Sequence, residues 1–422
     1  MHEQKPERGA LWRATNFRWL CGGAIVSMLG DQFTLVALPW LVLKLGHDPR
    51  ALGAVVAALT APGAVFMLVG GAIVDRVSPR RILLLTKLAN ALLIGLLGML
   101  VLAGRIDLPA VLGLAAGIGV CSAFAYPAAS ALLPGVLEAG LLAPANAMLM
   151  GLRQLSMLAG PLLAGALIAG FGSAQVGGVA DARGLGIAFL VDAASFLLSA
   201  ATLSRVRPRA AAPAAGDSKP PLLASLRAGL RYCWDDADLR VCFLYWSAMA
   251  LFLSGPLQVA LPLLATRLGG AGSYGSLMAA HGAGALAGMV LSGARPGLRL
   301  GTFGTTLLAV DGAVGLAFVA LAGVGTLWQG AGLLLVLGLL GGYLQVAIMA
   351  WLQRRIRPDM LGRGMALLMF LFMALSPLSA ALTGVLAAGT SLGALFGGVG
   401  MAMLAVVLAG YVATPIRHLR ER

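Results

Sequence analysis

The stretch that decides the fold is GGAIVDRVSPRR, residues 70–81. Apolar runs long enough to cross a membrane flank it, at about 51–74 and 82–103. Proline breaks a helix, and arginines next to an apolar run are retained on the cytoplasmic side of a membrane. The stretch therefore predicts a tight charged turn between two transmembrane helices, on the cytoplasmic face.

The composition extends this prediction to the whole chain. Of its 422 residues, 59% are hydrophobic and 11% are charged, and the mean hydropathy is +0.92. Soluble proteins carry about 25% charged residues, so we expect an all-α membrane protein. Twelve spans of about 20 residues or more are predicted at about 19–43, 51–74, 82–103, 108–129, 145–170, 185–203, 241–264, 274–293, 302–322, 327–352, 365–387 and 392–412.

One long polar stretch divides the chain into two halves of six spans each. It opens with arginines, continues through an Ala/Pro-rich segment and ends in an amphipathic pattern, which is typical of a helix on a membrane surface. The predicted parts are a cytoplasmic tail (1–18), an N-terminal six-helix bundle (19–203), a cytoplasmic linker with the amphipathic helix (204–238), a C-terminal six-helix bundle (239–413) and a basic cytoplasmic tail (414–422).

The net charge of +14 reflects membrane orientation rather than nucleic-acid binding. The basic residues lie mainly at span ends, and the sequence shows no soluble basic domain for a nucleic acid. Most of the 30 Lys and Arg residues fall on the inner side if both termini are cytoplasmic. The four cysteines and four histidines have no metal-ligand spacing and form no catalytic pattern, so we expect no metal, no cofactor and no enzyme activity.

The first hairpin also resembles the signature of the major facilitator superfamily. That signature has a glycine, an Asp-Arg pair and two basic residues, at the spacing of Gly71, Asp75, Arg76, Arg80 and Arg81. Within the superfamily, the chain resembles the drug:proton antiporter group that contains siderophore exporters and macrolide efflux pumps. The other residues that carry this resemblance are Asn16-Phe17-Arg18, Ser27, Gly30-Asp31, Asn146, Asp192-Ala193, Ser195-Phe196, Arg357-Pro358 and Gly362-Arg363.

The fifth span is similar to the antiporter signature of that group. Gly160, Pro161 and Gly165 match it and are expected to bend the helix, whereas Ala164 stands where a second glycine is usual. The resemblance implies two six-helix bundles that rock about a central cavity. It also implies export driven by the proton gradient.

The resemblance further implies a conformational latch at the first hairpin. In the family, the hairpin aspartate lies against the start of the eleventh helix, which is the positive end of a helix dipole. By this resemblance Asp75 meets the backbone near Gly362 and Arg363. The hairpin residues Gly71, Arg76, Arg80 and Arg81 complete the expected latch.

Three acids lie inside predicted spans: Asp31, Asp192 and Asp311. A carboxylate near the middle of a span costs about 2.5–3.5 kcal/mol on insertion scales, and such residues usually mark transport pathways. We expect these acids to be candidates for proton coupling, with Arg153 as a counter-charge for Asp31. The alternative is a structural polar contact between helices.

Other polar residues inside the spans are candidates for a substrate cavity. Arg153 is expected either to bind an anionic or catechol-like substrate or to pair with an acid on a neighbouring helix. His281 is the one histidine inside a predicted span, and it serves either a packing hydrogen bond or a proton relay. Gly284 and Gly288, four residues apart, indicate helix contact. The remaining cavity candidates are Gln154, Gln258 and Gln345.

Together these features predict a secondary active transporter of the bacterial inner membrane. We expect a monomer that exports a small amphipathic organic molecule, a siderophore or a hydrophobic drug, in exchange for protons. Its cytoplasmic arginines and lysines are expected to contact anionic lipid headgroups. A lysophospholipid flippase and a solute importer of the same fold are the alternatives. A membrane enzyme is disfavoured because the sequence shows no catalytic cluster, and a scaffold is disfavoured because it needs no acids in both halves.

Overall fold

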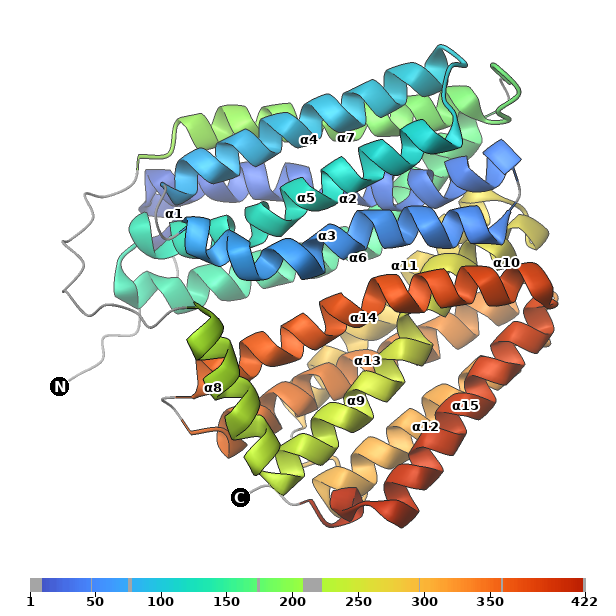
Figure 1. Ribbon diagram of the computed structural model, residues 1–422. Coiled ribbons are helices and arrows are strands. Elements are labelled where there is room, and N and C mark those ends of the chain that lie inside the picture. Colours follow the sequence, from blue (N-terminus) through green and yellow to red (C-terminus); the bar gives the residue numbers. More distant parts are fainter. Residues whose placement is uncertain are drawn as a thin grey trace. The chain divides into compact units, whose positions relative to one another are not determined.

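The structure, a computed structural model, describes residues 10–46, 48–74, 78–172, 175–207, 222–295, 297–357 and 360–419. In these segments the chain is helical apart from turns and one isolated bridge between Val176 and Val179. Twelve of the described helices are long and apolar enough to cross a membrane (Figure 1). This finding confirms the predicted all-α transmembrane fold.

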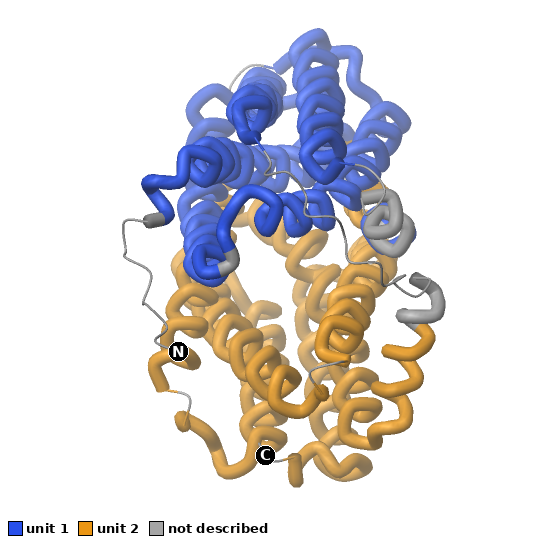
Figure 2. Tube along the Cα trace, turned by 90° about the vertical axis from the view of Figure 1, so that its left-hand side faces the viewer, with its two compact units in different colours: residues 1–45, 62–219 blue, residues 46–61, 220–422 orange. Residues whose placement is uncertain are grey.

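The chain divides into two compact units, which Figure 2 colours separately. The first unit consists of residues 1–45 and 62–219, and the second of residues 46–61 and 220–422. We expected residues 46–61 to belong to the N-terminal bundle, but they group with the second unit. The reason is a close backbone contact, since a Cβ on Gly53 would lie 2.7 Å from the Ala380 carbonyl oxygen and 3.0 Å from the Gly384 Cα.

The first unit contains the helices that carry the candidate acids Asp31 and Asp192. Its elements are α1 (Ala10–Arg13), α2 (Thr15–Gly46), the second half of α3 (Pro49–Val74), α4 (Pro79–Leu102), α5 (Leu108–Leu132), η1 (Leu133–Gly135), α6 (Ala139–Phe171) and α7 (Ala182–Ser204).

Glycines bring α4 and α7 into close contact in this unit. A Cβ on Gly98 would lie 3.1 Å from the Gly186 carbonyl oxygen, and one on Gly186 would lie 2.4 Å from Leu102 Cγ. Small residues let helices approach closely where lipid provides no hydrophobic driving force between them. These glycines therefore allow α4 and α7 to pack closely.

Besides the first half of α3, the second unit contains residues 220–422, which begin with the helix that the amphipathic pattern predicts. Its elements are α8 (Leu222–Asp235), α9 (Ala237–Gly255), η2 (Pro256–Ala260), α10 (Leu261–Arg267), α11 (Ala271–Ala294), α12 (Phe303–Leu321), α13 (Leu327–Arg355), α14 (Leu361–Gly389), α15 (Leu392–Ala413) and η3 (Pro415–His418). Elements α9, η2 and α10 together form one candidate span, Ala237–Arg267, in which η2 is a π-helical turn.

Glycines also bring α11 and α13 into close contact. A Cβ on Gly284 would lie 2.0 Å from the Leu335 carbonyl oxygen, and one on Gly288 would lie 2.0 Å from that of Leu339. The contact is reciprocal, because a Cβ on Gly338 of α13 would meet the backbone of α11 at 2.0 Å. The predicted role of Gly284 and Gly288 in helix contact is confirmed.

Candidate functional site

Helices α2 and α7 pack along a seam of small residues in the first unit. A Cβ on Gly23 would lie 2.1 Å from Thr202 Oγ1, and one on Gly30 would lie 2.0 Å from Ser195 Oγ. Helix periodicity places Gly23, Gly30 and Thr34 on one face of α2. Backbone and hydroxyl groups on that face of α2 lie against α7. They form a polar environment inside an apolar bundle.

Asp192 of α7 lies in this seam with none of its surface exposed. The Thr34 hydroxyl of α2 donates a hydrogen bond of 2.5 Å to its carboxylate Oδ2. The Ser195 hydroxyl, one turn along α7, donates to Oδ1 at 3.2 Å. Both carboxylate oxygens thus have partners, as a buried polar group requires.

Lys87 of α4 brings a positive charge to the same region. Its ammonium group donates a hydrogen bond of 3.2 Å to Ser27 Oγ on α2 and lies 5.6 Å from the centre of the Phe196 ring on α7. Electrostatically it interacts with both Asp31 and Asp192. Our prediction did not include Lys87, although an isolated lysine inside the run 82–103 is the same kind of signal as the intramembrane acids.

Asp31 follows Gly30 on α2, and its side chain is exposed on the surface of the first unit. The charged groups that act on it are Lys87 and Arg153, with Asp192 as the neighbouring acid. An exposed carboxylate half-way along a membrane span is costly against lipid, so this surface must contact water or polar groups. Asp31 and Asp192 therefore form a pair of acids with different access.

The other first-unit candidates lie on α6. Arg153 is exposed and interacts electrostatically with Asp31, as a counter-charge would, but no direct ion pair between them is found in the described part of the chain. Gly160 accommodates the side chain of Gln32, since a Cβ there would lie 2.3 Å from Gln32 Cγ. Pro161 is inside the helix, directly after this contact. The candidates Gln154 and Gly165 also lie on α6.

Asp311 of α12 is the buried acid of the second unit, with 8% of its surface exposed. The Tyr245 hydroxyl of α9 donates a hydrogen bond of 2.8 Å to its Oδ2. Its described partner is thus a neutral phenol, unlike the cations that act on Asp31. This contact is the kind expected of a polar link between helices, and a coupling role for Asp311 stays a prediction.

The remaining second-unit candidates do not join Asp311 in one cluster within the described residues. The Gln258 amide donates to Ser254 Oγ at 2.7 Å and to Ser376 Oγ at 3.1 Å, which ties η2 to α14. His281 of α11 has a buried Nδ1 without a hydrogen-bond partner in the described chain. Gln345 of α13 is exposed.

The predicted latch is described only in part. Asp75 and Arg76 lie outside the described residues, and Gly71 belongs to the last turn of α3. Arg80 donates to the Ser204 carbonyl oxygen at 2.5 Å and to that of Leu203 at 3.3 Å, so it caps the end of α7. At the start of α14, Arg363 contacts the α8 residue Gly229, whose added Cβ would lie 3.0 Å from Arg363 Cβ. The remaining latch residues, Arg81 and Gly362, begin α4 and α14.

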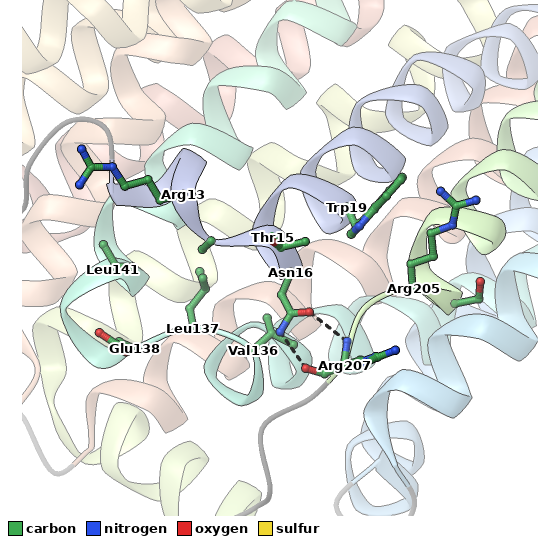
Figure 3. Close-up of a pocket in the computed structure, with 12 residues that line it drawn as sticks. Arg13, Thr15, Asn16, Trp19, Val136, Leu137, Glu138, Leu141, Arg205 and Arg207 are labelled. Carbon is green, nitrogen blue, oxygen red and sulfur yellow. Dashed lines mark hydrogen bonds between the residues drawn. The ribbon is translucent and has the colours of Figure 1, made fainter.

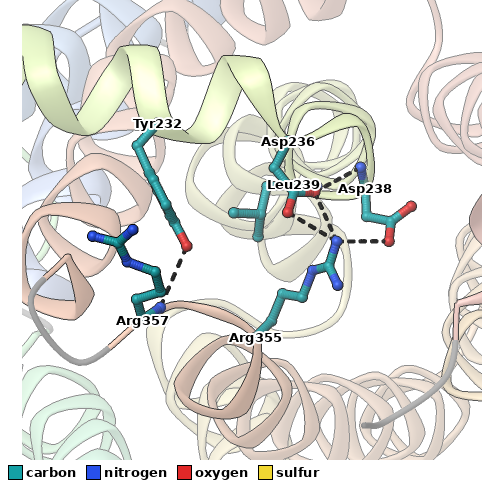
Figure 4. A network of polar contacts seen from close by, with 6 residues as sticks. All are labelled: Tyr232, Asp236, Asp238, Leu239, Arg355 and Arg357. Carbon is teal, nitrogen blue, oxygen red and sulfur yellow. Dashed lines mark hydrogen bonds and ion pairs between the residues drawn. The ribbon is translucent and has the colours of Figure 1, made fainter.

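A polar network fixes the junction between α8, α9 and α13 (Figure 4). Arg355 contacts Asp236 at 2.8 Å and Asp238 at 3.0 Å. The Arg357 backbone N–H donates to the Tyr232 hydroxyl oxygen at 3.3 Å. Asp236 is also the N-cap of α9, because its side chain accepts hydrogen bonds from two backbone N–H groups there. The junction is therefore a structural joint of the second unit.

An open pocket of about 990 Å³ lies at the beginning of α2 and the end of α7 (Figure 3). Asn16 closes one side by exchanging two hydrogen bonds, of 2.7 and 3.0 Å, with the Arg207 backbone. The Arg205 guanidinium stacks 4.5 Å above the Trp19 ring. Fifteen residues of α2, about 22 Å of helix, separate Asn16 from Asp31. This pocket is therefore distinct from the acid pair.

No group of three or more potential metal-ligating side chains occurs among the described residues. The four cysteines are buried and unpaired. The candidate site is therefore the group of interacting ionisable side chains Asp31, Lys87 and Asp192, from α2, α4 and α7. It combines an accessible acid, a buried acid and a cation inside one bundle.

Among curated proteins, the chain is similar to the multidrug efflux pump Tap of Mycolicibacterium fortuitum. The two are 32% identical over 228 residues, which cover 51% of this chain and 52% of Tap. The match thus spans about half the length of that relative.

The fold is similar to those of solved transporter structures. A bacterial homologue of the human lysosomal transporter Spinster, inward-facing and unoccupied, has a TM-score of 0.72 and 14% identity, and the match covers 98% of this chain and 96% of that one. The nucleoside transporter NupG has a TM-score of 0.69 and 12% identity, covering 93% and 97%. At these identities the likeness concerns the fold alone. The family model described as Major Facilitator Superfamily matches residues 20–381, and the chain therefore belongs to this superfamily of membrane transporters.

Proposed function

We propose that this transporter exports small amphipathic organic molecules and takes up protons in exchange. The observation that supports this proposal is the acid pair in the first unit, where Asp31 is exposed and Asp192 is fully buried beside Lys87. Ionisable groups at this depth are costly and mark ion pathways. The similarity of half the chain to a multidrug efflux pump supports export as the direction.

In the proposed cycle, Asp31 binds a proton when its surface is open to the outside and releases it when that surface is open to the cytoplasm. Protonation removes its charge, so the energy of the exposed carboxylate changes with the state of the transporter. Substrate leaves the cytoplasm while Asp31 is deprotonated. One proton moving across ~100 mV with a gradient of one pH unit supplies about 3.7 kcal/mol, enough for a gradient of roughly 500-fold.

The proposed cargo is a hydrophobic drug-like molecule, with a siderophore as the second member of the same class. The supporting observation for the drug is again the relative Tap. The proposed location is the bacterial inner membrane with both termini in the cytoplasm, which agrees with the basic residues at the span ends.

Everted membrane vesicles with an acidified interior test the proposal with a panel of hydrophobic fluorescent dyes. We expect the wild-type protein to accumulate at least one dye inside, and Asp31→Asn to abolish accumulation while leaving dye counterflow measurable. Asp235→Asn is the matched control, because Asp235 is an exposed acid at the end of α8. Dye efflux on acidification would identify an importer, and unchanged accumulation by Asp31→Asn would exclude Asp31 from coupling.

A further inference from the structure

We propose that Lys87 is a positioning residue of the proton-exchange site, and that its ammonium group sets the pH at which Asp31 binds a proton. The inference rests on the proposed function, since it assigns a task within that proton exchange. Neither the predicted site nor the resemblance to the antiporter group includes Lys87. Its place is defined by three helices of one compact unit.

The contacts of Lys87 hold its ammonium group without neutralising it. The Ser27 hydroxyl at 3.2 Å and the Phe196 ring at 5.6 Å are both uncharged. Ser199 Oγ lies 3.5 Å from Ser27 Oγ and extends this polar support to α7. A cation inside a bundle needs an opposite charge, and the acids that act on Lys87 are Asp31 and Asp192.

Ser27 brings the ammonium group near Asp31 through helix geometry. Ser27 and Asp31 are four residues apart on α2, so their Cβ atoms lie about 6 Å from each other on neighbouring turns. The Lys87 ammonium group, hydrogen-bonded to Ser27, therefore lies close enough to the Asp31 carboxylate for a strong electrostatic interaction. The Ser27 hydroxyl acts as the support that fixes this distance.

The two acids differ in how freely they can exchange a proton. Asp192 has no exposed surface, and its two oxygens already accept hydrogen bonds from Thr34 and Ser195. Asp31 has an exposed side chain, so it is the more accessible of the two acids. Asp31 is therefore the exchanging acid, and Asp192 is its buried, hydrogen-bonded neighbour.

The charges around Asp31 determine the expected sign of the effect. They are Lys87 from α4, Arg153 from α6 and Asp192 from α7. A nearby cation favours the ionised form of a carboxyl group, and a nearby anion favours the protonated form. Removing the Lys87 charge must therefore let Asp31 hold its proton at higher pH.

The test is carbodiimide labelling of Asp31 in membranes, followed by mass spectrometry, across a range of pH. A carbodiimide reacts with the protonated carboxyl group, so the midpoint of labelling reports proton binding without requiring transport. We expect Lys87→Gln to move the midpoint upward by about one pH unit or more, and Lys87→Arg to stay close to wild type. Lys44→Gln is the matched control, because Lys44 pairs with Asp181 near the end of α2.

The variant Lys87→Gln leaves a buried acid without its cation and can fail to fold. The same test can then compare Asp192→Asn with the double variant Lys87→Gln/Asp192→Asn. Neither of these contains an Asp192 carboxylate that lacks its cation. We expect the midpoint of the double variant to exceed that of Asp192→Asn by about one pH unit. Equal midpoints would overturn the inference.

Transport in everted vesicles separates this inference from the proposed function. If dye accumulates, we expect the pH optimum of Lys87→Gln to move in the same alkaline direction as the labelling midpoint. A labelling shift without any dye transport would reject the proposed function and retain the electrostatic role of Lys87. A lower protein yield with an unchanged labelling midpoint would reduce Lys87 to a structural role and reject the inference.

Discussion

At the scale of the residue, charge inside the membrane is an informative feature of this sequence. Asp31 and Asp192 could be selected from the sequence because acids are rare in apolar runs. Their unequal exposure could not, because it depends on the rotation of α2 and α7 about their axes. Lys87 obeys the same rarity rule and was detectable, but its link to Ser27 is visible only in three dimensions.

The hydrogen bond from Thr34 to Asp192 gives a prediction at this scale. Thr34→Val keeps the shape of the side chain and removes the donor, which leaves a buried acceptor short of one partner. We expect the free energy of unfolding in detergent to fall by about 1–3 kcal/mol. Thr34→Ser keeps the hydroxyl donor and should lower this free energy much less. Thermal unfolding of both variants measures this difference.

A double-mutant cycle provides the control for that prediction. In an Asp192→Asn background the neutral amide depends less on the Thr34 hydroxyl, so Thr34→Val should cost clearly less there. Equal costs in the two backgrounds would mean that the hydrogen bond contributes nothing to stability.

At the scale of the element, the glycine pattern and the hydropathy of the sequence predicted the helices and one helix contact. They predicted less about the surroundings of single residues. The spacing of Gly284 and Gly288 predicted a helix contact, and these glycines touch the backbone of α13. The pattern did not identify the partner helix, because the matching glycines Gly338 and Gly342 lie more than 50 residues away. The π-helical turn η2 was not predicted either, since hydropathy does not distinguish a π-helical turn from an α-helical one.

Alanine substitution tests the contact between α11 and α13. Gly284→Ala places a Cβ 2.0 Å from a carbonyl oxygen, so the two helices must separate and lose their packing. We expect a clear drop in the melting temperature and in the yield of monodisperse protein. Gly293→Ala on the same helix is the matched control, because nothing lies within 4 Å of its added Cβ. It should be neutral or up to about 1 kcal/mol stabilising, and similar losses in both variants would contradict the contact.

At the scale of the whole molecule, the sequence predicted twelve spans and a polar linker because length and hydropathy are local properties. The grouping of residues 46–61 with the second unit could not be predicted, since it depends on the contact of Gly53 with α14. The predicted latch remains a prediction, because Asp75 and Arg76 lie outside the described residues.

The joint after the linker gives a prediction with a pH dependence. Burial raises the pKa of the Cys233 thiol to about 11, and the neighbouring Asp236 carboxylate adds to this rise. Only about 0.03% of the thiol is then ionised at pH 7.5. In a variant whose other cysteines are serine, maleimide labelling should be very slow and should rise about tenfold per pH unit below pH 11.

Arg355→Gln should accelerate this labelling at least about tenfold, because it removes the partner of Asp236 and opens the joint. Arg231→Gln is the matched control, since Arg231 forms an exposed pair with Asp235 on the same helix. Fast labelling of the starting variant at neutral pH would show that Cys233 is not buried in solution.

The buried hydrogen bond between Thr34 and Asp192 has a consequence for biosynthesis. Asp192 belongs to the last helix of its unit to leave the ribosome, whereas Thr34 and Lys87 belong to helices made much earlier. The acid alone adds about 2.5–3.5 kcal/mol to the cost of insertion, but it enters a bilayer that already holds its hydroxyl donor and its cation. Late synthesis thus makes α7 the helix that completes the polar contacts of its bundle.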